Sequence, residues 1–114
     1  MTTIWHNPRC SKSRQTLALL EDAGHDVMVF KYLETPPSVA AIRTALDTLD
    51  IKAIALMRTG EKAFKDAGLS KTDTDDKLIA AMAENPILIE RPVVFHNNKA
   101  AIGRPPEAVL DLFK

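Results

Sequence analysis

The chain has 114 residues, 46% of them hydrophobic, and its 15 basic and 15 acidic side chains cancel to zero net charge. This length suits one domain with a buried core, so we expect a single domain over residues 1–114. The neutral balance argues against non-specific nucleic-acid binding. No apolar run reaches the ~18 residues of a membrane span, and the N-terminus lacks a signal-peptide pattern. The lone cysteine fits the reducing cytoplasm. We expect a monomer, because no exposed apolar stripe is legible from the sequence.

The first third of the chain predicts a strand, a helix and a second strand. Residues 2–6 form a short strand that Asn7 and Pro8 end. A helical pattern runs from Ser11 to Ala23, and Gly24 suits the position just after a helix. Residues 27–32 are β-branched and aromatic, which predicts a second, buried strand. A strand, a crossover helix and a strand indicate a parallel βαβ unit.

Residues 38–86 predict a helical insertion. Ser38 caps a helix whose apolar side chains recur at helical spacing, namely Val39, Ile42, Leu46 and Leu49. Short helical pieces are expected at 51–57 and 61–67, the latter closed by Gly68. Asp73 or Thr74 caps a further helix that ends before Pro86.

The C-terminal third predicts a hairpin and a last helix. Residues 93–96 and 99–102 flank Asn97-Asn98, an acceptable two-residue turn. After a break at 103–106, a helix over 107–113 is expected to turn Val109, Leu110 and Phe113 inward. The predicted fold class is therefore α/β, with a four-stranded mixed sheet flanked by helices and a helical insertion.

Cys10 is the only cysteine, and it follows the first strand in the run His-Asn-Pro-Arg-Cys-Ser-Lys-Ser-Arg at 6–14. A thiol between a strand and a helix faces unpaired helix N–H groups, which favour the nucleophilic thiolate. The same amides can hold an oxyanion beside the sulfur. The polar flanks predict an exposed, reactive thiol, and a buried structural cysteine is the alternative. Without a second cysteine, any disulfide formed in a reaction must involve another molecule.

His6, four residues before Cys10, is a candidate for lowering the pKa of the thiol as an imidazolium or a donor. The alternative is a polar strand-end residue bonded to the backbone. Ser11 and Ser13 offer hydroxyl and amide donors to a bound oxyanion.

Other polar residues have simpler interpretations. Lys12 and Arg14 fit the solvated face of the first helix. His25 lies in a turn and His96 beside the hairpin turn, so both are predicted to be surface residues. Three histidines and one cysteine show no metal-ligand spacing, so we expect no metal and no bound cofactor.

Three arginines stand at element ends, and two of them precede prolines: Arg58, Arg91 and Arg104. Singly, each is most simply a surface charge or a structural ion pair. Together they could clamp a tetrahedral oxyanion, because the planar guanidinium makes two charge-assisted hydrogen bonds to such an anion.

Four motifs carry a resemblance to a known family. They are the run at 6–14, Tyr-Leu-Glu-Thr-Pro-Pro at 32–37, Asn-Pro-Ile-Leu-Ile-Glu-Arg-Pro at 85–92 and Ile-Gly-Arg-Pro-Pro at 102–106. In this order they resemble the ArsC family, glutaredoxin-coupled arsenate reductases with a thioredoxin-like fold. The resemblance extends over essentially the whole chain.

The resemblance implies roles for individual residues. Cys10 looks like the nucleophile that attacks arsenate, and His6 is similar to the residue that helps to lower its pKa. Ser13 falls where the family often has a serine close to the thiolate. Pro92 stands where thioredoxin-like folds have a cis proline. The residues similar to the family's oxyanion-binding trio are Arg58, Arg91 and Arg104.

The implied reaction begins with a Cys10–arsenate adduct. Glutathione, a co-substrate rather than a bound cofactor, then attacks the adduct, so that arsenite leaves and a Cys10–glutathione mixed disulfide remains. Glutaredoxin clears this disulfide. The expected partners are therefore arsenate or a similar oxyanion, glutathione and glutaredoxin, with no nucleic acid and no membrane.

Two alternatives share the fold. An Spx-like regulator binds RNA polymerase, but Spx proteins commonly carry a Cys-x-x-Cys switch, and Ser13 occupies the second position here. A thiol oxidoreductase of the same fold would act on another substrate, with arsenate incidental.

Overall fold

The computed structural model describes residues 2–114, and the chain forms two compact units. The sheet unit consists of the N-terminal residues to Thr35 together with Arg91–Lys114. The helical unit is Pro36–Glu90. The insertion expected from the sequence spans about 38–86. Within the described part, no helix is both long and apolar enough to span a bilayer.

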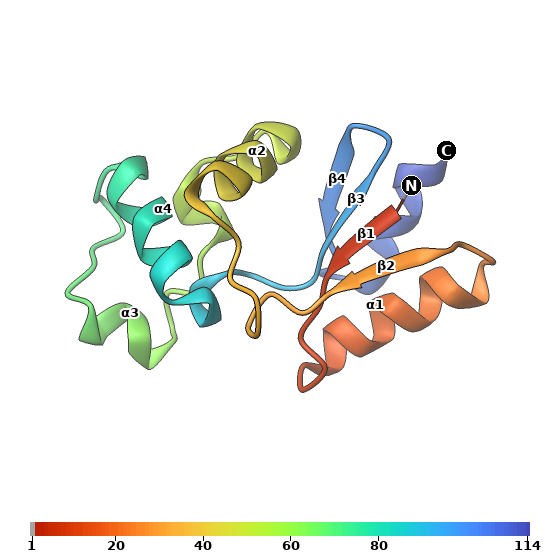
Figure 1. The fold of residues 1–114 in the computed structure, drawn as a ribbon, viewed down its shortest axis with the longest axis horizontal. Coiled ribbons are helices and arrows are strands. Elements are labelled where there is room, and N and C mark those ends of the chain that lie inside the picture. Colours follow the sequence, from red (N-terminus) through yellow and green to blue (C-terminus); the bar gives the residue numbers. More distant parts are fainter. Residues whose placement is uncertain (1) are drawn as a thin grey trace. The chain divides into compact units, whose positions relative to one another are not determined.

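The sheet unit contains the predicted four-stranded mixed sheet, with strand order β2-β1-β3-β4 (Figure 1). β1 pairs parallel with β2 and antiparallel with β3, and β3 pairs antiparallel with β4. The strands are β1 Thr2–Trp5, β2 Val27–Phe30, β3 Val93–His96 and β4 Lys99–Ile102. The βαβ unit, the hairpin and the thioredoxin-like fold that the sequence predicts are all present.

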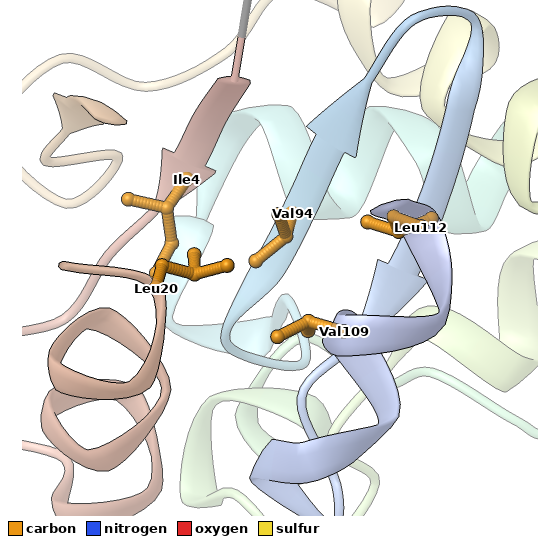
Figure 2. Packing of buried hydrophobic residues seen from close by; sticks show 5 residues of the cluster. All are labelled: Ile4, Leu20, Val94, Val109 and Leu112. Carbon is orange, nitrogen blue, oxygen red and sulfur yellow. The ribbon is translucent and has the colours of Figure 1, made fainter. Parts of the chain in front are cut away.

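Two helices cover one face of this sheet: α1, Ser11–Asp22, and the 3₁₀ helix η3, Pro106–Phe113. Their buried side chains meet those of the two central strands in one cluster (Figure 2), made of Ile4, Leu20, Val94, Val109 and Leu112. Four of these five side chains are fully buried. Leu20 belongs to α1, so this core packs that helix against the sheet.

The prediction of a buried strand over 27–32 is wrong in two respects. β2 ends at Phe30, and it is an edge strand in which Met28 is 56% and Val29 40% exposed. Apolar, β-branched composition favours a strand but does not say how many neighbours that strand has. Tyr32, just beyond the strand, is fully buried.

The C-terminal helix also differs from the prediction. The helix is of the 3₁₀ type, which repeats every three residues, so its buried side chains are Pro106, Val109 and Leu112. The predicted inward residues assumed an α-helical period, and Leu110 is only half-buried as a result.

His25 and His96 are half-buried rather than surface residues. The ring of His25 stacks on Phe113 with centroids 3.7 Å apart, and the ring of His96 lies 4.4 Å from the same phenyl ring. Their places in the sequence gave no sign of this contact, because Phe113 belongs to the distant C-terminal helix η3.

The helical unit comprises α2 Val39–Leu49, η1 Ala53–Leu56, α3 Lys62–Asp66, α4 Asp75–Glu84 and η2 Pro86–Leu88. The predicted caps are confirmed, because the Ser38 hydroxyl accepts a hydrogen bond from Ala41 N and the Thr74 hydroxyl from Lys77 N. α2 and α4 pack against each other through the apolar faces that the sequence pattern indicates.

Candidate active site

Cys10 is the N-cap residue of α1, at the predicted junction of strand and helix. A tight turn precedes it, because Cys10 N donates to Asn7 O at 3.0 Å and the Asn7 side-chain oxygen accepts from Arg9 N at 3.0 Å. Asparagine and proline favour such turns, since Asn bonds the backbone two residues ahead and Pro fixes φ. The cysteine is half-buried, neither sealed in the core nor fully exposed.

The surroundings of the sulfur favour its ionised form. Burial alone raises the pKa of Cys10, but the N–H groups of Ser13 and Lys12 and the guanidinium of Arg91 outweigh it. The net effect is a pKa below the ordinary value of a cysteine thiol. A helix N-terminus and a nearby cation are the conditions that make a cysteine reactive.

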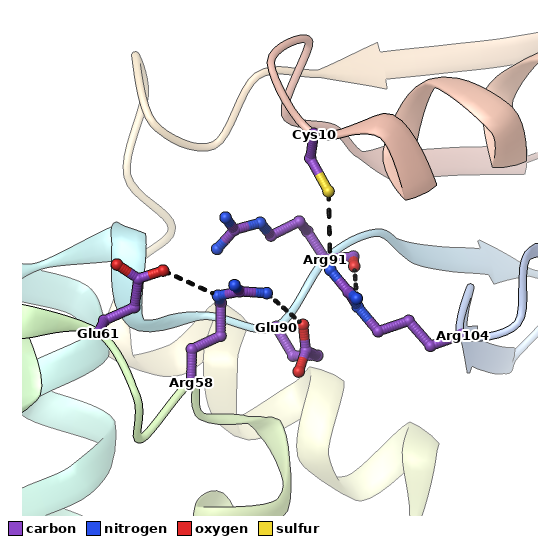
Figure 3. A network of polar contacts seen from close by, with 6 residues as sticks. All are labelled: Cys10, Arg58, Glu61, Glu90, Arg91 and Arg104. Carbon is purple, nitrogen blue, oxygen red and sulfur yellow. Dashed lines mark hydrogen bonds and ion pairs between the residues drawn. The ribbon is translucent and has the colours of Figure 1, made fainter.

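Two of the predicted arginines lie beside Cys10 (Figure 3). Arg104 Nη2 donates to Cys10 Sγ at 3.6 Å, and Arg104 Nε donates to the carbonyl oxygen of Arg91 at 2.9 Å. Arg91 is only 8% exposed, and its guanidinium group is among the causes that lower the pKa of the Cys10 thiol. The peptide bond to Pro92 is cis, as the resemblance implies, and the bond to Pro105 is cis as well.

Gly103 brings the Arg104 segment against α1, a role that the sequence analysis missed. A Cβ at this position would lie 2.5 Å from Thr16 Oγ1 and 2.7 Å from Pro92 Cγ. Thr16 is fully buried, and its hydroxyl donates to Lys12 O at 2.8 Å. Gly103 N also donates to Pro92 O at 2.9 Å. Glycine is therefore required at position 103, because Thr16 and Pro92 lie too close to its backbone for any side chain.

His6 lies against Ser13, with His6 Nδ1 2.7 Å from Ser13 Oγ. Asn7 N donates to the same hydroxyl at 3.0 Å. The side chains of all three residues are buried, so these bonds tie the end of β1 to the first turn of α1. The serine hydroxyl is thus engaged within the fold, and the group of Ser13 that faces Cys10 is its backbone N–H.

The pKa of His6 is lowered, first by burial and then by the positive charges of Lys31 and Arg14. Its neutral form is therefore favoured near neutral pH. The structure places the imidazole in contact with Ser13, whose N–H group in turn faces the sulfur.

Arg58 belongs to the helical unit, where two carboxylates hold it (Figure 3). Its Nε lies 3.0 Å from Glu61 Oε1, and its Nη1 lies 3.0 Å from Glu90 Oε1. Backbone bonds align these segments, from Arg58 N to Leu88 O at 2.8 Å and from Glu90 N to Leu56 O at 2.7 Å. Sequence reasoning missed both partners, although the i,i+3 spacing of Glu61 is a recognisable signal.

The structure thus brings together Cys10, Arg91 and Arg104. His6 contacts the side chain of Ser13, whose backbone N–H group faces the Cys10 sulfur. A thiolate beside two guanidinium groups can act as a nucleophile toward a bound oxyanion, because the cations neutralise charge on the oxygens. A contribution of Arg58 to the same clamp stays a prediction. Among residues 2–114, no cluster of three histidine, cysteine or acidic side chains suited to a metal ion occurs.

Known proteins resemble this chain along nearly its whole length. The sequence model of the ArsC family matches residues 5–112. An Escherichia coli (strain K12) protein described as uncharacterized, YfgD, is 49% identical over 111 residues, which cover 96% of this chain and 93% of that protein. An arsenate reductase of Neisseria meningitidis serogroup A is 44% identical over 108 residues, covering 93% of this chain and 92% of the relative.

Solved structures agree with these sequence relatives. The structure of an arsenate reductase from Vibrio cholerae has a TM-score of 0.94 and 50% sequence identity, and covers 97% of this chain and 96% of that one. A cysteine at the start of α1, the two arginines beside it and this match in sequence and fold have one common explanation: the chain belongs to the ArsC family.

Proposed function

We propose that this protein is an arsenate reductase that uses glutathione and glutaredoxin as its source of electrons. The observation that carries the proposal is the Cys10 sulfur, whose lowered pKa coincides with the guanidinium groups of Arg91 and Arg104 at its side. Relatives at 44% identity bear the name arsenate reductase, which supports the choice of arsenate among tetrahedral oxyanions.

In the first step, the Cys10 thiolate attacks the arsenic atom and a sulfur–arsenic bond forms. One arsenate oxygen leaves as water after taking up protons, and arsenic remains in the +5 state. Arg91 and Arg104 neutralise the negative charge of the remaining oxygens, as electrostatic stabilisation requires. The helix N–H groups that lower the pKa of Cys10 keep the sulfur ionised until the attack.

In the second step, a glutathione thiolate attacks the Cys10 sulfur. A disulfide bond forms, and the electron pair of the sulfur–arsenic bond stays on arsenic, which is reduced to the +3 state and leaves as arsenite. Because Cys10 is the only cysteine, the disulfide has to include an external thiol. A glutaredoxin thiol then attacks the glutathione sulfur and releases the Cys10 thiolate. This chemistry needs no bound cofactor and suits the reducing cytoplasm.

The test is a coupled assay of NADPH oxidation with glutathione, glutaredoxin and glutathione reductase. Arsenate should support turnover, whereas phosphate and the absence of an oxyanion should not. Cys10→Ser should abolish turnover, Arg104→Ala should raise KM for arsenate, and Lys99→Ala on β4 serves as the control. Turnover of a mixed disulfide without any oxyanion would instead identify a thiol oxidoreductase. Capture of the RNA polymerase α subunit without arsenate turnover would identify an Spx-like regulator.

A further inference from the structure

A cavity of about 330 Å³ lies beside the turn that leads to Cys10. Its walls are the turn itself and the segment that follows β2, both within the sheet unit: His6, Asn7, Pro8, Arg9, Lys31, Leu33 and Glu34. This volume is at the lower end of the range of small-molecule sites, roughly 300–1,000 Å³. The oxyanion-binding mechanism described above leaves the cavity without a role.

Both cationic and anionic residues line the cavity. Most of the lining surface is apolar, with Pro8 and Leu33 contributing to it, and the charged residues at the cavity are the cationic Arg9 and Lys31 and the anionic Glu34. Lys31 and Glu34 belong to one tight turn, because Glu34 N donates to Lys31 O at 3.0 Å. The aliphatic stems of the long side chains can line such a cavity while their charged ends remain hydrated.

We propose that this cavity binds the thiol co-substrate, a tripeptide of the glutathione type, and places its sulfur next to Cys10. The inference rests on the proposed function, which requires an external thiol. Near neutral pH, glutathione carries two carboxylates and one ammonium group. Arg9 and Lys31 match the carboxylates and Glu34 matches the ammonium group, so the charges of ligand and cavity are complementary.

The cavity is lined by Arg9, the residue that precedes the reactive cysteine. Arg9 is bonded directly to Cys10, and consecutive Cα atoms are about 3.8 Å apart. An extended tripeptide spans roughly 10 Å, and the thiol of glutathione is on its middle residue. With its two ends held by Arg9 and Lys31, the ligand can therefore bring its sulfur to the neighbouring residue.

An inorganic oxyanion fits this cavity less well. Glu34 would repel it, and the arginines that contact the Cys10 sulfur, Arg91 and Arg104, are not among the lining residues. The two substrates are thus assigned to different residues, the tripeptide to the cavity and the oxyanion to Arg91 and Arg104.

A kinetic experiment measures arsenite formation while glutathione and arsenate are varied separately. Arg9→Glu and Lys31→Glu should each raise KM for glutathione roughly fivefold, as reversal of an exposed charge contact allows. KM for arsenate should stay unchanged, as should the rate with 2-mercaptoethanol, which has neither carboxylate nor ammonium. Lys99→Glu, a charge reversal on the exposed end of β4, should change none of these values. Equal KM for glutathione in the parent and both cavity variants overturns the proposal.

A comparison of two thiols, with and without the ammonium group, tests the role of Glu34. Glu34→Gln should raise KM for glutathione but leave KM unchanged for glutaryl-cysteinylglycine, which lacks the ammonium group. An equal increase for both thiols overturns the pairing of Glu34 with the ammonium group, since the substitution would then act through something other than that charge.

A binding experiment separates this proposal from the reductase assignment. The Cys10→Ser protein is titrated with S-methylglutathione, which cannot form a disulfide, and backbone amide shifts are followed by NMR. Shifts should gather at the amides of residues 6, 7, 9 and 31–34 and should weaken in the Arg9→Glu background. Shifts elsewhere, or none, overturn the cavity proposal even if arsenate is reduced. Binding at these residues without arsenite formation would sustain the cavity and reject the reductase assignment.

Discussion

Arg104 holds Arg91 as well as the Cys10 sulfur, because its Nε donates to the Arg91 carbonyl oxygen while its Nη2 lies 3.6 Å from Sγ. One guanidinium thereby joins the β4 end of the sheet unit to the segment that enters β3 and to the start of α1. Because the acceptor at residue 91 is a backbone oxygen, a substitution of Arg91 leaves this bond in place, whereas a substitution of Arg104 removes it.

The first prediction concerns the ionisation of Cys10. Thiol alkylation follows the thiolate, so its rate should level off at a lower pH than for free cysteine, because the folded protein lowers the pKa. Arg91→Ala removes one of the groups that lower this pKa and should move the midpoint to higher pH. Arg91→Lys should restore part of the shift, since it keeps the charge but not the planar fork. The measurement is the iodoacetamide reaction rate against pH, and an unchanged midpoint in Arg91→Ala contradicts the assignment.

The second prediction concerns the buried hydroxyl behind the cysteine. Ser13→Ala removes the partner of both the Asn7 N–H group and the His6 imidazole. A buried donor left without a partner costs about 1–3 kcal/mol, so the free energy of unfolding should fall by that amount. Ser11→Ala, on the exposed side of the same turn, should stay within about 0.5 kcal/mol of the parent. Urea unfolding compares the two, and equal stabilities would argue against these bonds.

The third prediction concerns the close approach at Gly103. Gly103→Ala forces a Cβ against Thr16 and Pro92, and overpacking of this kind costs about 1–3 kcal/mol. Gly60→Ala is the matched control, because a Cβ there meets nothing within 4 Å. Thermal unfolding should show a lower Tm for Gly103→Ala only. If that variant is as stable as Gly60→Ala, the contact is looser than the distances indicate.

The fourth prediction concerns the carboxylates around Arg58. A double-mutant cycle of Arg58→Ala and Glu90→Gln should give a coupling free energy of about 0.5–1 kcal/mol, because both side chains are about three-quarters buried. The Arg43–Asp76 pair, with side chains 48% and 80% exposed, should give a value near zero. Urea unfolding at low and high salt supplies the data. If the coupling free energy equals that of the Arg43–Asp76 pair, the ion pair between Arg58 and Glu90 does not stabilise the fold.

Local chemistry explains why much of the fold was predictable. The Ser38 and Thr74 caps, Gly24 with φ +87° after α1, and the Asn97-Asn98 turn with positive φ angles all depend on residues within one turn of each other. Cys10 was predictable in the same way, as a polar-flanked residue between a strand and a helix.

The features that escaped prediction depend on distant partners. Nothing in residues 27–30 says that β2 has only one neighbour, and nothing near Gly103 says that Thr16 lies against it. Glu90 meets Arg58 across 32 residues because short backbone bonds align their two segments. The 3₁₀ period of η3 likewise differs from the α-helical period that the pattern of Val109 and Leu110 suggested.

Cysteine is an uncommon choice for the residue that begins a helix. Serine, threonine, aspartate and asparagine stabilise that position by about 1 kcal/mol, because an oxygen accepts from the first free amides. At Cys10 no side-chain hydrogen bond of normal geometry caps α1, although the sulfur lies beside the amides of Lys12 and Ser13. A reactive thiol at this position therefore comes with a less stable start of α1. Cys10→Ser should accordingly raise the Tm of the protein while it removes the activity.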